Sequence, residues 1–181
     1  MFWLARRRTR LSWTWRWLNI ACCCVATTRS DAGQSAGKHL PQYRHHTVSP
    51  PLFSIITVCF NGFAHLSSTV QSLRSQTACG QFEWVVVDGA STEGSAGWLA
   101  GQQPDVFVSE PDRGIYDAMN KGIGLARGQW PFFLNAGDKF ADADVLCDVK
   151  AAIAAQPGAQ IVYGDVLYFG ERGSAATVSI G

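Results

Sequence analysis

Two short apolar runs constrain this chain of 181 residues more than any other feature of its sequence. Residues 53–60 read FSIITVCF and residues 83–88 read EWVVVD, and both runs are almost unbroken by polar side chains. A strand with one solvated face alternates apolar and polar residues, whereas a strand buried on both faces does not. The two runs therefore predict strands inside a parallel sheet that is covered on both sides.

Segments with helical spacing alternate with further strand candidates along the rest of the chain. We expect helices around 66–73, 93–101, 115–123 and 145–153, and strands at 105–109, 130–135 and 160–167. Ile115, Met119 and Ile123 mark the expected buried face of the third helix. Strands that alternate with helices indicate an α/β fold, with a mostly parallel sheet flanked by helices and right-handed crossovers.

Polar residues follow three of the expected strands at the point where each strand ends. Asn61-Gly62 comes after the first run, Asp88-Gly89 ends the second, and residues 135–138 (NAGD) follow the strand at 130–135. In an open α/β sheet, ligands bind beyond the carboxyl ends of the strands. The sequence therefore predicts a polar ligand site at this edge of the sheet.

The usual phosphate-binding loops are absent from the sequence. No GxGxxG follows the first strand and no GxxxxGK[ST] occurs, which argues against a Rossmann dehydrogenase and a P-loop NTPase. A site without such a loop can neutralise a diphosphate with a divalent cation held by a carboxylate. Asp138 is placed for this work, and hard oxygen ligands suit Mg²⁺ or Mn²⁺.

Four blocks, in this order, carry a resemblance to a known family. They are SIITVCFNG (54–62), WVVVDGAST (84–92), SEPDRGIYDAMNKGIGLARG (109–128) and FFLNAGD (132–138). Together they resemble family 2 glycosyltransferases of the GT-A fold, and look closest to bacterial enzymes of polysaccharide assembly, such as the colanic-acid type, or of glycolipid assembly. The resemblance covers about residues 52–167.

The resemblance implies a role for particular residues. Thr57 and Phe60-Asn61 match the end of the first strand that contacts the nucleoside. Asp88 matches the acid that reads the base, and Asp138 matches the metal ligand, for Mg²⁺ or Mn²⁺. The residues implied in nucleotide-sugar binding are Thr57, Asn61, Asp88, Arg113, Gly114, Asn120 and Asn135. Asn135 and Gly137 stand where the family often has acids, so Asp138 is the one carboxylate of the motif.

Each of these residues also has a purely structural interpretation. Asp88 could be the acid of a turn, and Asp138 could be a helix cap or a loop acid. Arg113 could pair with a neighbouring acid, and Asn120 could be a solvated residue on a helix face. The sequence leaves these alternatives open.

The implied reaction moves a sugar from a UDP- or GDP-linked donor to the hydroxyl of a saccharide or lipid-linked acceptor, with inversion. The family places its catalytic base well beyond the metal motif, so the base is expected after Gly181 and no residue here is assigned to it. The chain looks truncated at its C-terminus relative to the family. A nucleotide-sugar-binding fragment that lacks the acceptor half and does not catalyse transfer is the alternative.

Residues 1–51 differ in composition from residues 52–181, the expected glycosyltransferase domain. They hold eight Lys/Arg and one acid, a net charge of +7, whereas the later seven Lys/Arg and thirteen acids give −6. The acidic domain argues against nucleic acid as a partner. Basic, Trp-rich residues 1–27 suit peripheral membrane contact. A cleaved leader and an extension without a role in the fold are the alternatives.

The six cysteines form no CxxC pair and three of them are contiguous. This is neither a zinc pattern nor a disulfide framework, so reduced thiols are expected. No apolar stretch reaches the 18 residues of a membrane span. We therefore expect a cytoplasmic protein, with contact at the inner face of the membrane through residues 1–27.

Overall fold

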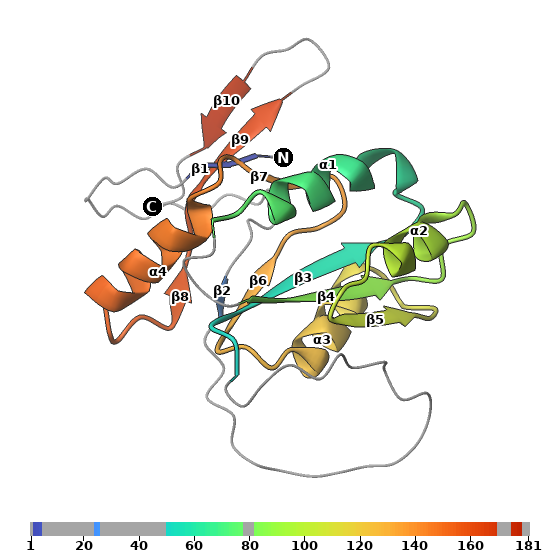
Figure 1. Cartoon of the computed structure of the whole chain (residues 1–181), viewed down its shortest axis with the longest axis horizontal. Coiled ribbons are helices and arrows are strands. Elements are labelled where there is room, and N and C mark those ends of the chain that lie inside the picture. Colours follow the sequence, from blue (N-terminus) through green and yellow to red (C-terminus); the bar gives the residue numbers. More distant parts are fainter. Residues whose placement is uncertain (1, 5–23, 26–49, 78–81, 170–174, 179–181) are drawn as a thin grey trace.

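A four-stranded parallel sheet forms the centre of the computed structural model, which describes residues 2–4, 24–25, 50–77, 82–169 and 175–178. Its strands are β3 (Phe53–Cys59), β4 (Phe82–Asp88), β5 (Val106–Ser109) and β6 (Trp130–Phe133), in the spatial order β5-β4-β3-β6 (Figure 1). All three pairings are parallel. The parallel α/β sheet expected from the two apolar runs is confirmed.

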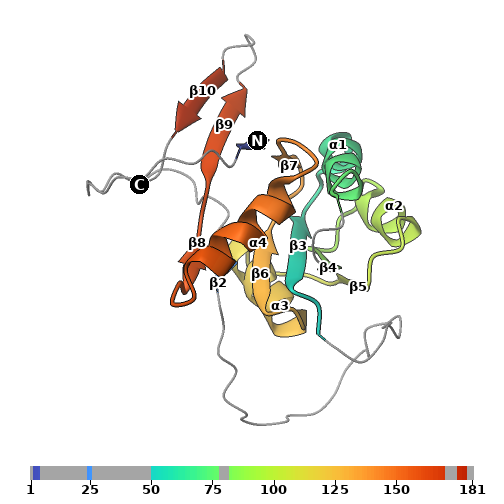
Figure 2. The same ribbon diagram turned by 60° about the vertical axis from the view of Figure 1, so that its left-hand side comes forward.

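Helices cover both faces of this sheet. They are α1 (Phe63–Arg74), α2 (Ser95–Gly101), α3 (Ile115–Leu125) and α4 (Val145–Ala155). The views in Figures 1 and 2 place α1 and α2 on one side of the sheet and α3 on the other. The chain thus runs outward from β3 to β5 and returns to the other side of β3 at β6. The reversal puts a topological switch point between β3 and β6, where α/β sheets bind ligands.

The core forms where α3 packs against β3 and β4. All seven residues of β3 are buried, as are the last six of β4. At Gly122, a Cβ atom would lie 2.5 Å from Cγ2 of Ile56, so the glycine allows the helix to approach the strand this closely. Met119 is buried as expected, but Ile115 is 51% exposed and does not belong to the core. Its position at the first residue of α3 puts it past the sheet edge.

Short strands lie outside the central sheet. β1 (Phe2–Leu4), β7 (Lys139–Phe140), β9 (Asp165–Phe169) and β10 (Ala175–Val178) form one sheet, and β2 (Cys24–Val25) pairs with β8 (Ile161–Val162). The single strand expected at 160–167 is therefore wrong, because Tyr163-Gly164 separates β8 from β9 and the two join different sheets. The remainder of residues 1–49 lies outside the described residues, and the leader or anchor stays a prediction.

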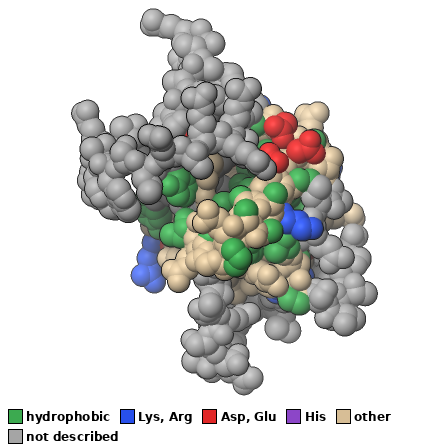
Figure 3. Space-filling view, turned by 90° about the vertical axis from the view of Figure 1, so that its left-hand side faces the viewer, with side chains coloured by type: hydrophobic (Ala, Val, Ile, Leu, Met, Phe, Trp, Pro, Cys, Tyr) green, Lys and Arg blue, Asp and Glu red, His purple; other side chains and the backbone are tan. Residues whose placement is uncertain are grey.

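The lengths and polarity of the described helices, and the side chains at the surface, bear on where the protein is located. None of the helices in the described ranges is long and apolar enough to cross a bilayer. On the face shown in Figure 3, the visible hydrophobic side chains are interspersed with polar ones, and acidic side chains gather at one edge.

Cys59 is free and buried, whereas Cys147 takes part in a disulfide, so the expectation of reduced thiols does not hold at Cys147.

One buried carboxylate, Glu83, ties β4 to β3 and to the loop between α3 and β6. Its Oε2 accepts a hydrogen bond from Nε of Arg127 at 2.8 Å, and its Oε1 accepts one from the Ser54 hydroxyl at 2.6 Å. Oε1 also accepts the backbone N–H groups of Arg127 at 2.5 Å and Gly128 at 3.1 Å. The Glu83 side chain is 3% exposed and that of Arg127 39%. The carboxylate therefore satisfies several donors that would otherwise be left unpaired.

Replacing Glu83 should destabilise the fold far more than replacing its partner. Glu83→Ala removes the acceptor of the Ser54 hydroxyl and of the Arg127 backbone N–H, while the Gly128 N–H keeps the Oγ of Ser54 at 2.8 Å. We expect a loss of about 3–5 kcal/mol in the free energy of unfolding, because buried donors without an acceptor are costly. Arg127→Ala exposes the carboxylate to water from the partly solvated side, and we expect roughly 1 kcal/mol. Urea unfolding of both variants measures the difference, and equal losses would contradict this account.

Candidate functional site

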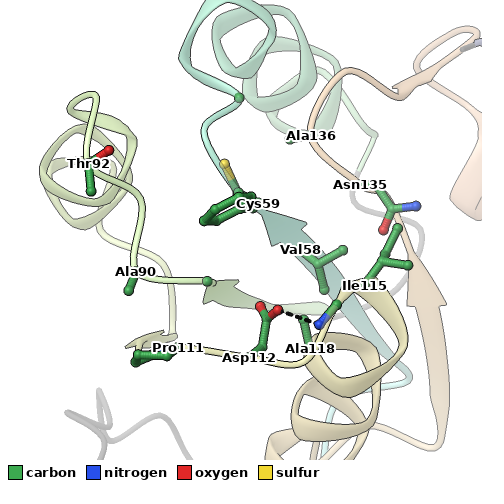
Figure 4. A pocket seen from close by; sticks show the side chains of 14 residues that line it. Val58, Cys59, Ala90, Thr92, Pro111, Asp112, Ile115, Ala118, Asn135 and Ala136 are labelled. Atoms are coloured by element: carbon green, nitrogen blue, oxygen red, sulfur yellow. Dashed lines mark hydrogen bonds between the residues drawn. The ribbon is translucent and has the colours of Figure 1, made fainter.

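A cavity of about 800 Å³ opens at the carboxyl edge of the central sheet. Figure 4 shows it from close by, with Asn135 and Ile115 across the opening from Ala90 and Thr92. Loops after all four strands contribute to its wall, together with the start of α3. The lining residues are Val58, Cys59, Phe60, Gly62, Gly89, Ala90, Thr92, Pro111, Asp112, Gly114, Ile115, Ala118, Asn135 and Ala136. A cavity is therefore present at the edge where the sequence predicts a ligand site, and its volume suits a small ligand.

The loops after β3 and β4 are held together by side chains rather than by the sheet. The N–H of Asn61 donates to Oγ of Ser91 at 2.8 Å, and Oδ1 of Asn61 accepts the N–H of Thr92 at 3.0 Å. Asn61 has φ of 49°, a left-handed conformation that Asn tolerates better than most residues. Asn61 thus fixes the rim of the cavity, although it does not line it.

Ala90 lines the cavity with φ of 61°, a conformation that L residues other than Asn, Asp and Gly rarely adopt. Such backbone strain persists only where the surrounding structure enforces it, and it tends to occur at functional sites. Here the reciprocal bonds between the two loops act on the residues that flank Ala90. The strained backbone of Ala90 therefore lies in the same part of the cavity rim that Asn61 fixes.

Asp88 lies beneath the cavity and is 0% exposed. Its Oδ2 accepts the N–H of Ser91 at 3.0 Å and the hydroxyl of Ser109 at 2.6 Å, so Asp88 fixes the ends of β4 and β5. Its Oδ1 is a buried acceptor without a hydrogen-bond partner among the described residues. The interpretation of Asp88 as a turn acid thus accounts for Oδ2. It does not account for Oδ1, which could still accept a hydrogen bond.

Two wall residues at the end of β3 have contrasting exposure. Phe60 is 66% exposed and presents its ring at the mouth of the cavity. Cys59 is 4% exposed, and burial raises the pKa of its thiol, so the side chain is a neutral wall residue rather than a nucleophile. The resemblance already implies that Phe60 lies at the strand end that contacts the nucleoside, whereas the apolar pattern of residues 53–60 concealed Cys59 as a wall residue.

Asp112 is a second residue that the sequence interpretation missed. It lines the cavity, and its Oδ1 accepts the N–H of Gly114 at 2.8 Å (Figure 4). Gly114, with φ of 116°, precedes the first residue of α3 and also lines the cavity. A signal for Asp112 was present in the sequence, because an Asp two residues before a glycine at a helix start is the pattern of an Asx turn.

The loop from Asn135 to Asp138 closes on itself. Oδ2 of Asp138 accepts the N–H of Asn135 at 3.2 Å, and the N–H of Asp138 donates to the carbonyl of Asn135 at 2.9 Å. Gly137, with φ of 96°, donates its N–H to Oγ1 of Thr69 on α1 at 3.0 Å. Asp138 therefore acts as a loop acid, as one of the sequence interpretations has it, because its carboxylate holds the N–H of Asn135.

The same loop offers oxygen ligands for a divalent cation. Asn135 lines the cavity, and its Oδ1 is a buried acceptor with no hydrogen-bond partner among the described residues. An amide oxygen and a carboxylate fit Mg²⁺ or Mn²⁺, which complete their coordination with substrate oxygens and water. No group of three or more His, Cys, Asp or Glu side chains in the described part could hold a metal by itself. The residues present fit an ion shared with a ligand.

Six of the eight residues expected to bind the nucleotide sugar or the metal do not line the cavity; Asn61, Asp88 and Asp138 are described above, and Thr57, Arg113 and Asn120 are the other three. Thr57 is fully buried in β3, where its Oγ1 accepts the indole N–H of Trp84 at 3.0 Å. Arg113 and Asn120 are exposed, and the backbone N–H of Arg113 donates to Asp117 at 3.1 Å. The structure thus brings Gly114 and Asn135 to the cavity, places Asn61, Asp88 and Asp138 at or behind its walls, and leaves these three apart.

The fold and the edge cavity define an α/β protein with a cavity at a topological switch point, the place where such sheets bind ligands. The sequence model of Glycosyl transferase family 2 matches residues 54–178, and the chain belongs to this family. The parallel sheet and its helices are the GT-A fold of these glycosyltransferases.

Curated relatives and solved structures agree with this assignment. The chain is 39% identical over 125 residues to a PGL/p-HBAD biosynthesis glycosyltransferase of Mycobacterium bovis, covering 66% of this chain and 48% of the relative. It is 30% identical over 95 residues to the putative teichuronic acid biosynthesis glycosyltransferase TuaG of Bacillus subtilis, covering 50% and 37%. The chain thus spans about half the length of the mycobacterial relative.

Two solved structures share the fold. S. aureus TarS 1-349 in complex with UDP-GlcNAc has a TM-score of 0.52 at 22% identity, over 58% of this chain and 32% of that chain. The mannosyltransferase PcManGT from Pyrobaculum calidifontis, in complex with GDP-Man and Mn²⁺, has a TM-score of 0.51 at 23% identity, over 65% and 36%. At these identities the likeness shows the fold alone.

Asp138 should lower the stability of the metal-free protein at neutral pH. Burial raises the pKa of its carboxyl group, so folding favours the protonated form. An acid with a raised folded pKa stabilises fully below its unfolded pKa and loses that contribution as pH rises through the folded pKa. Asp138→Asn, which keeps an acceptor for the Asn135 N–H, should therefore be more stable than the natural protein at pH 7.

Thermal unfolding in EDTA measures this difference. The advantage of Asp138→Asn should disappear as the pH falls below the ordinary range of a carboxyl group, where the natural side chain is also neutral. Asp148→Asn, an exposed acid in the first turn of α4, is the control and should show no such gain. A natural protein more stable than Asp138→Asn at pH 7 would contradict the burial argument.

Proposed function

We propose that this chain binds a nucleoside-diphosphate sugar in the edge cavity and acts as the donor-binding part of an inverting glycosyltransferase. The observation that carries the proposal is the cavity at the switch point between β3 and β6, with an exposed aromatic ring on one wall and oxygen ligands on the other. Membership of the family and the complexes of TarS with UDP-GlcNAc and of PcManGT with GDP-Man support a UDP- or GDP-linked donor.

The nucleoside is proposed to lie against Phe60, above Asp88. An exposed aromatic face can stack on any base, which gives affinity without selecting one base. The unpartnered Oδ1 of Asp88 supports a role in reading the base, provided that a movement of the rim opens access to it. Gly114 lines the nucleotide pocket in this scheme, and Asn61 holds its rim. Arg113 and Asn120 are proposed at its periphery, and Thr57 acts only through the packing of β3.

Asn135 and Asp138 are proposed to hold Mg²⁺ or Mn²⁺ together with the diphosphate. When bound, the ion neutralises the diphosphate and stabilises its departure as the leaving group. Asp138 supplies the charge, and the buried Oδ1 of Asn135 supplies a neutral oxygen. Because this site has one carboxylate, metal affinity should be weak until the donor is present.

Transfer requires an acceptor hydroxyl that attacks the anomeric carbon from the face opposite the diphosphate. The new C–O bond forms as the bond to the diphosphate breaks, and a base takes the hydroxyl proton, so the centre is inverted. No carboxylate in the cavity wall other than Asp112 is available among the described residues, and Asp112 lies on the nucleoside side. The base is therefore proposed to belong to an acceptor-binding region and not to this cavity.

The acceptor is proposed to be a saccharide or a lipid-linked saccharide of a cell-surface polymer or glycolipid. Two relatives are named as glycosyltransferases of PGL/p-HBAD biosynthesis and, putatively, of teichuronic acid biosynthesis, and these names support this class. The second candidate function is binding of the donor without transfer. It is favoured by one observation, that Asp112 is the one carboxylate among the described residues that line the cavity, so the cavity offers little choice of an acceptor base.

A cytoplasmic location, at the inner face of the membrane, is proposed for the site of synthesis. The net charge of +7 in residues 1–51 supports it, since basic segments are attracted to anionic lipid. The disulfide of Cys147 is an observation against it, because reducing compartments disfavour disulfides. Vesicle sedimentation with and without anionic lipid, using the full chain, tests the membrane contact.

Calorimetric titration tests the proposed function directly. UDP and GDP should bind more tightly with Mn²⁺ than in EDTA, and Asp138→Ala should remove the metal effect while leaving binding in EDTA unchanged. A transfer assay with the matching sugar nucleotide then separates the two candidates. Binding without transfer favours the binding module, and no binding of either nucleotide refutes both.

Phe60 should contribute to affinity through stacking. Phe60→Ala removes the ring, and we expect a loss of about 1–3 kcal/mol in nucleotide binding, because stacking of one base on an aromatic ring contributes that much. Tyr116→Ala removes an aromatic ring that is 60% exposed but does not line the cavity, and it should leave affinity unchanged. Equal effects of the two substitutions would show that the base lies elsewhere.

A further inference from the structure

The cavity contains one carboxylate in its wall, Asp112, among the described residues, and neither the sequence pattern nor the metal site accounts for it. Asp88 is buried beneath the floor with Oδ2 fully engaged, and Asp138 is turned back onto its own loop. Asp112 is therefore the acid that a ligand entering this cavity meets directly.

The two oxygens of Asp112 have different surroundings. Oδ1 accepts the N–H of Gly114 at 2.8 Å, which anchors the carboxylate at the start of α3. Oδ2 is turned toward the end of β4, where it lies 2.6 Å from the point that a Cβ atom on Gly89 would occupy. One oxygen is thus held by the protein, and the other is presented at the floor of the cavity.

Gly89 makes room for this arrangement. It is not among the described glycines with positive φ, so its backbone conformation does not require glycine. A Cβ atom at Gly89 would also lie 3.2 Å from Cδ2 of Phe60. The aromatic ring and the carboxylate therefore converge on one point, and the missing side chain keeps that point open.

An aromatic ring beside an anionic acceptor is suited to a ligand with a flat face and a hydrogen-bond donor at its edge. A nucleoside has both, because uracil and guanine carry a ring N–H and ribose carries hydroxyl groups. We propose that Asp112 is a specificity-determining residue whose Oδ2 accepts a hydrogen bond from an N–H or O–H group of the donor nucleoside. This inference rests on the proposed function.

Asp112→Asn is the main test. Its Oδ1 can still accept the N–H of Gly114, while an NH₂ group replaces the acceptor Oδ2, so the shape is kept and the polarity at the cavity is reversed. The dissociation constant of UDP or GDP, whichever the natural protein binds more tightly, should rise about 10- to 100-fold, since hydrogen bonds to charged groups contribute that much. Asp117→Asn, whose carboxylate caps the same helix but does not line the cavity, should leave it unchanged.

Analogues identify the donor group. The natural protein and Asp112→Asn are titrated with the ring-N-methylated, 2′-deoxy and 3′-deoxy forms of the same nucleotide. The analogue that lacks the group bound by Asp112 should bind the natural protein weakly and lose little further affinity in the variant. If the losses in affinity from Asp112→Asn and from N-methylation are not additive, Asp112 binds the base. If the losses from Asp112→Asn and from a deoxy form are not additive, Asp112 binds the ribose. Additive losses with all three analogues would overturn the inference.

Gly89→Ala gives an independent test by displacing Asp112 without changing its charge. The methyl group meets the end of a flexible side chain at 2.6 Å, so the carboxylate moves and the fold should be kept. Circular dichroism should be unchanged and nucleotide affinity should fall about as far as in Asp112→Asn. Unchanged affinity in both variants refutes the inference but not the proposed function. Absence of nucleotide binding by the natural protein refutes both.

Discussion

The burial of β3 on both faces and along both edges is the constraint on which the rest of the structure depends. β3 pairs with β4 on one side and β6 on the other, and α3 packs across it. Because no polar side chain can be solvated along such a strand, its chemistry is confined to the residues just after it. Phe60, Asn61 and Gly62 lie at that end, where the chain has β4 and β6 as immediate neighbours.

The sequence predicted most of the sheet because burial on both faces leaves a clear pattern. The runs at 53–60 and 83–88 could be assigned to parallel strands, and the polar residues after them to one edge, from periodicity alone. The split of 160–167 into β8 and β9 could not be predicted in this way. That split depends on which distant segments, β2 and β1, the two halves pair with.

The site was predicted only in part, for a similar reason. A helical pattern shows which residues share a face, but it does not show where the helix ends relative to the sheet. Ile115 has the spacing of a core residue, yet as the first residue of α3 it projects past the sheet and lines the cavity. The prediction for Thr57 failed in the opposite way. Thr57 is close in sequence to the end of the strand, but its side chain points into the core, where it contacts Trp84.

Asp88, Asp112 and Asp138 lie at this edge of the sheet and differ in their hydrogen-bond partners. They therefore have different roles. Asp88 has Oδ2 paired with Ser91 and Ser109, so it maintains the geometry of the strand ends. Asp112 has one oxygen anchored by the protein and one presented to the cavity. Asp138 is half-buried in a loop that raises its pKa, which makes it costly to the fold while no cation is bound.

The charges at this edge also support the proposal that a cation accompanies a diphosphate ligand here. Residues 52–181 carry a net charge of −6, and the cavity wall has no Lys or Arg among the described residues that line it. A diphosphate brought to this edge would meet like charge without a compensating group from the protein. A divalent ion held by Asp138 would offset that repulsion, and its binding would also offset the free energy that the buried carboxylate costs the empty protein. Donor and cation should therefore bind cooperatively, with each raising the affinity of the other by the same factor.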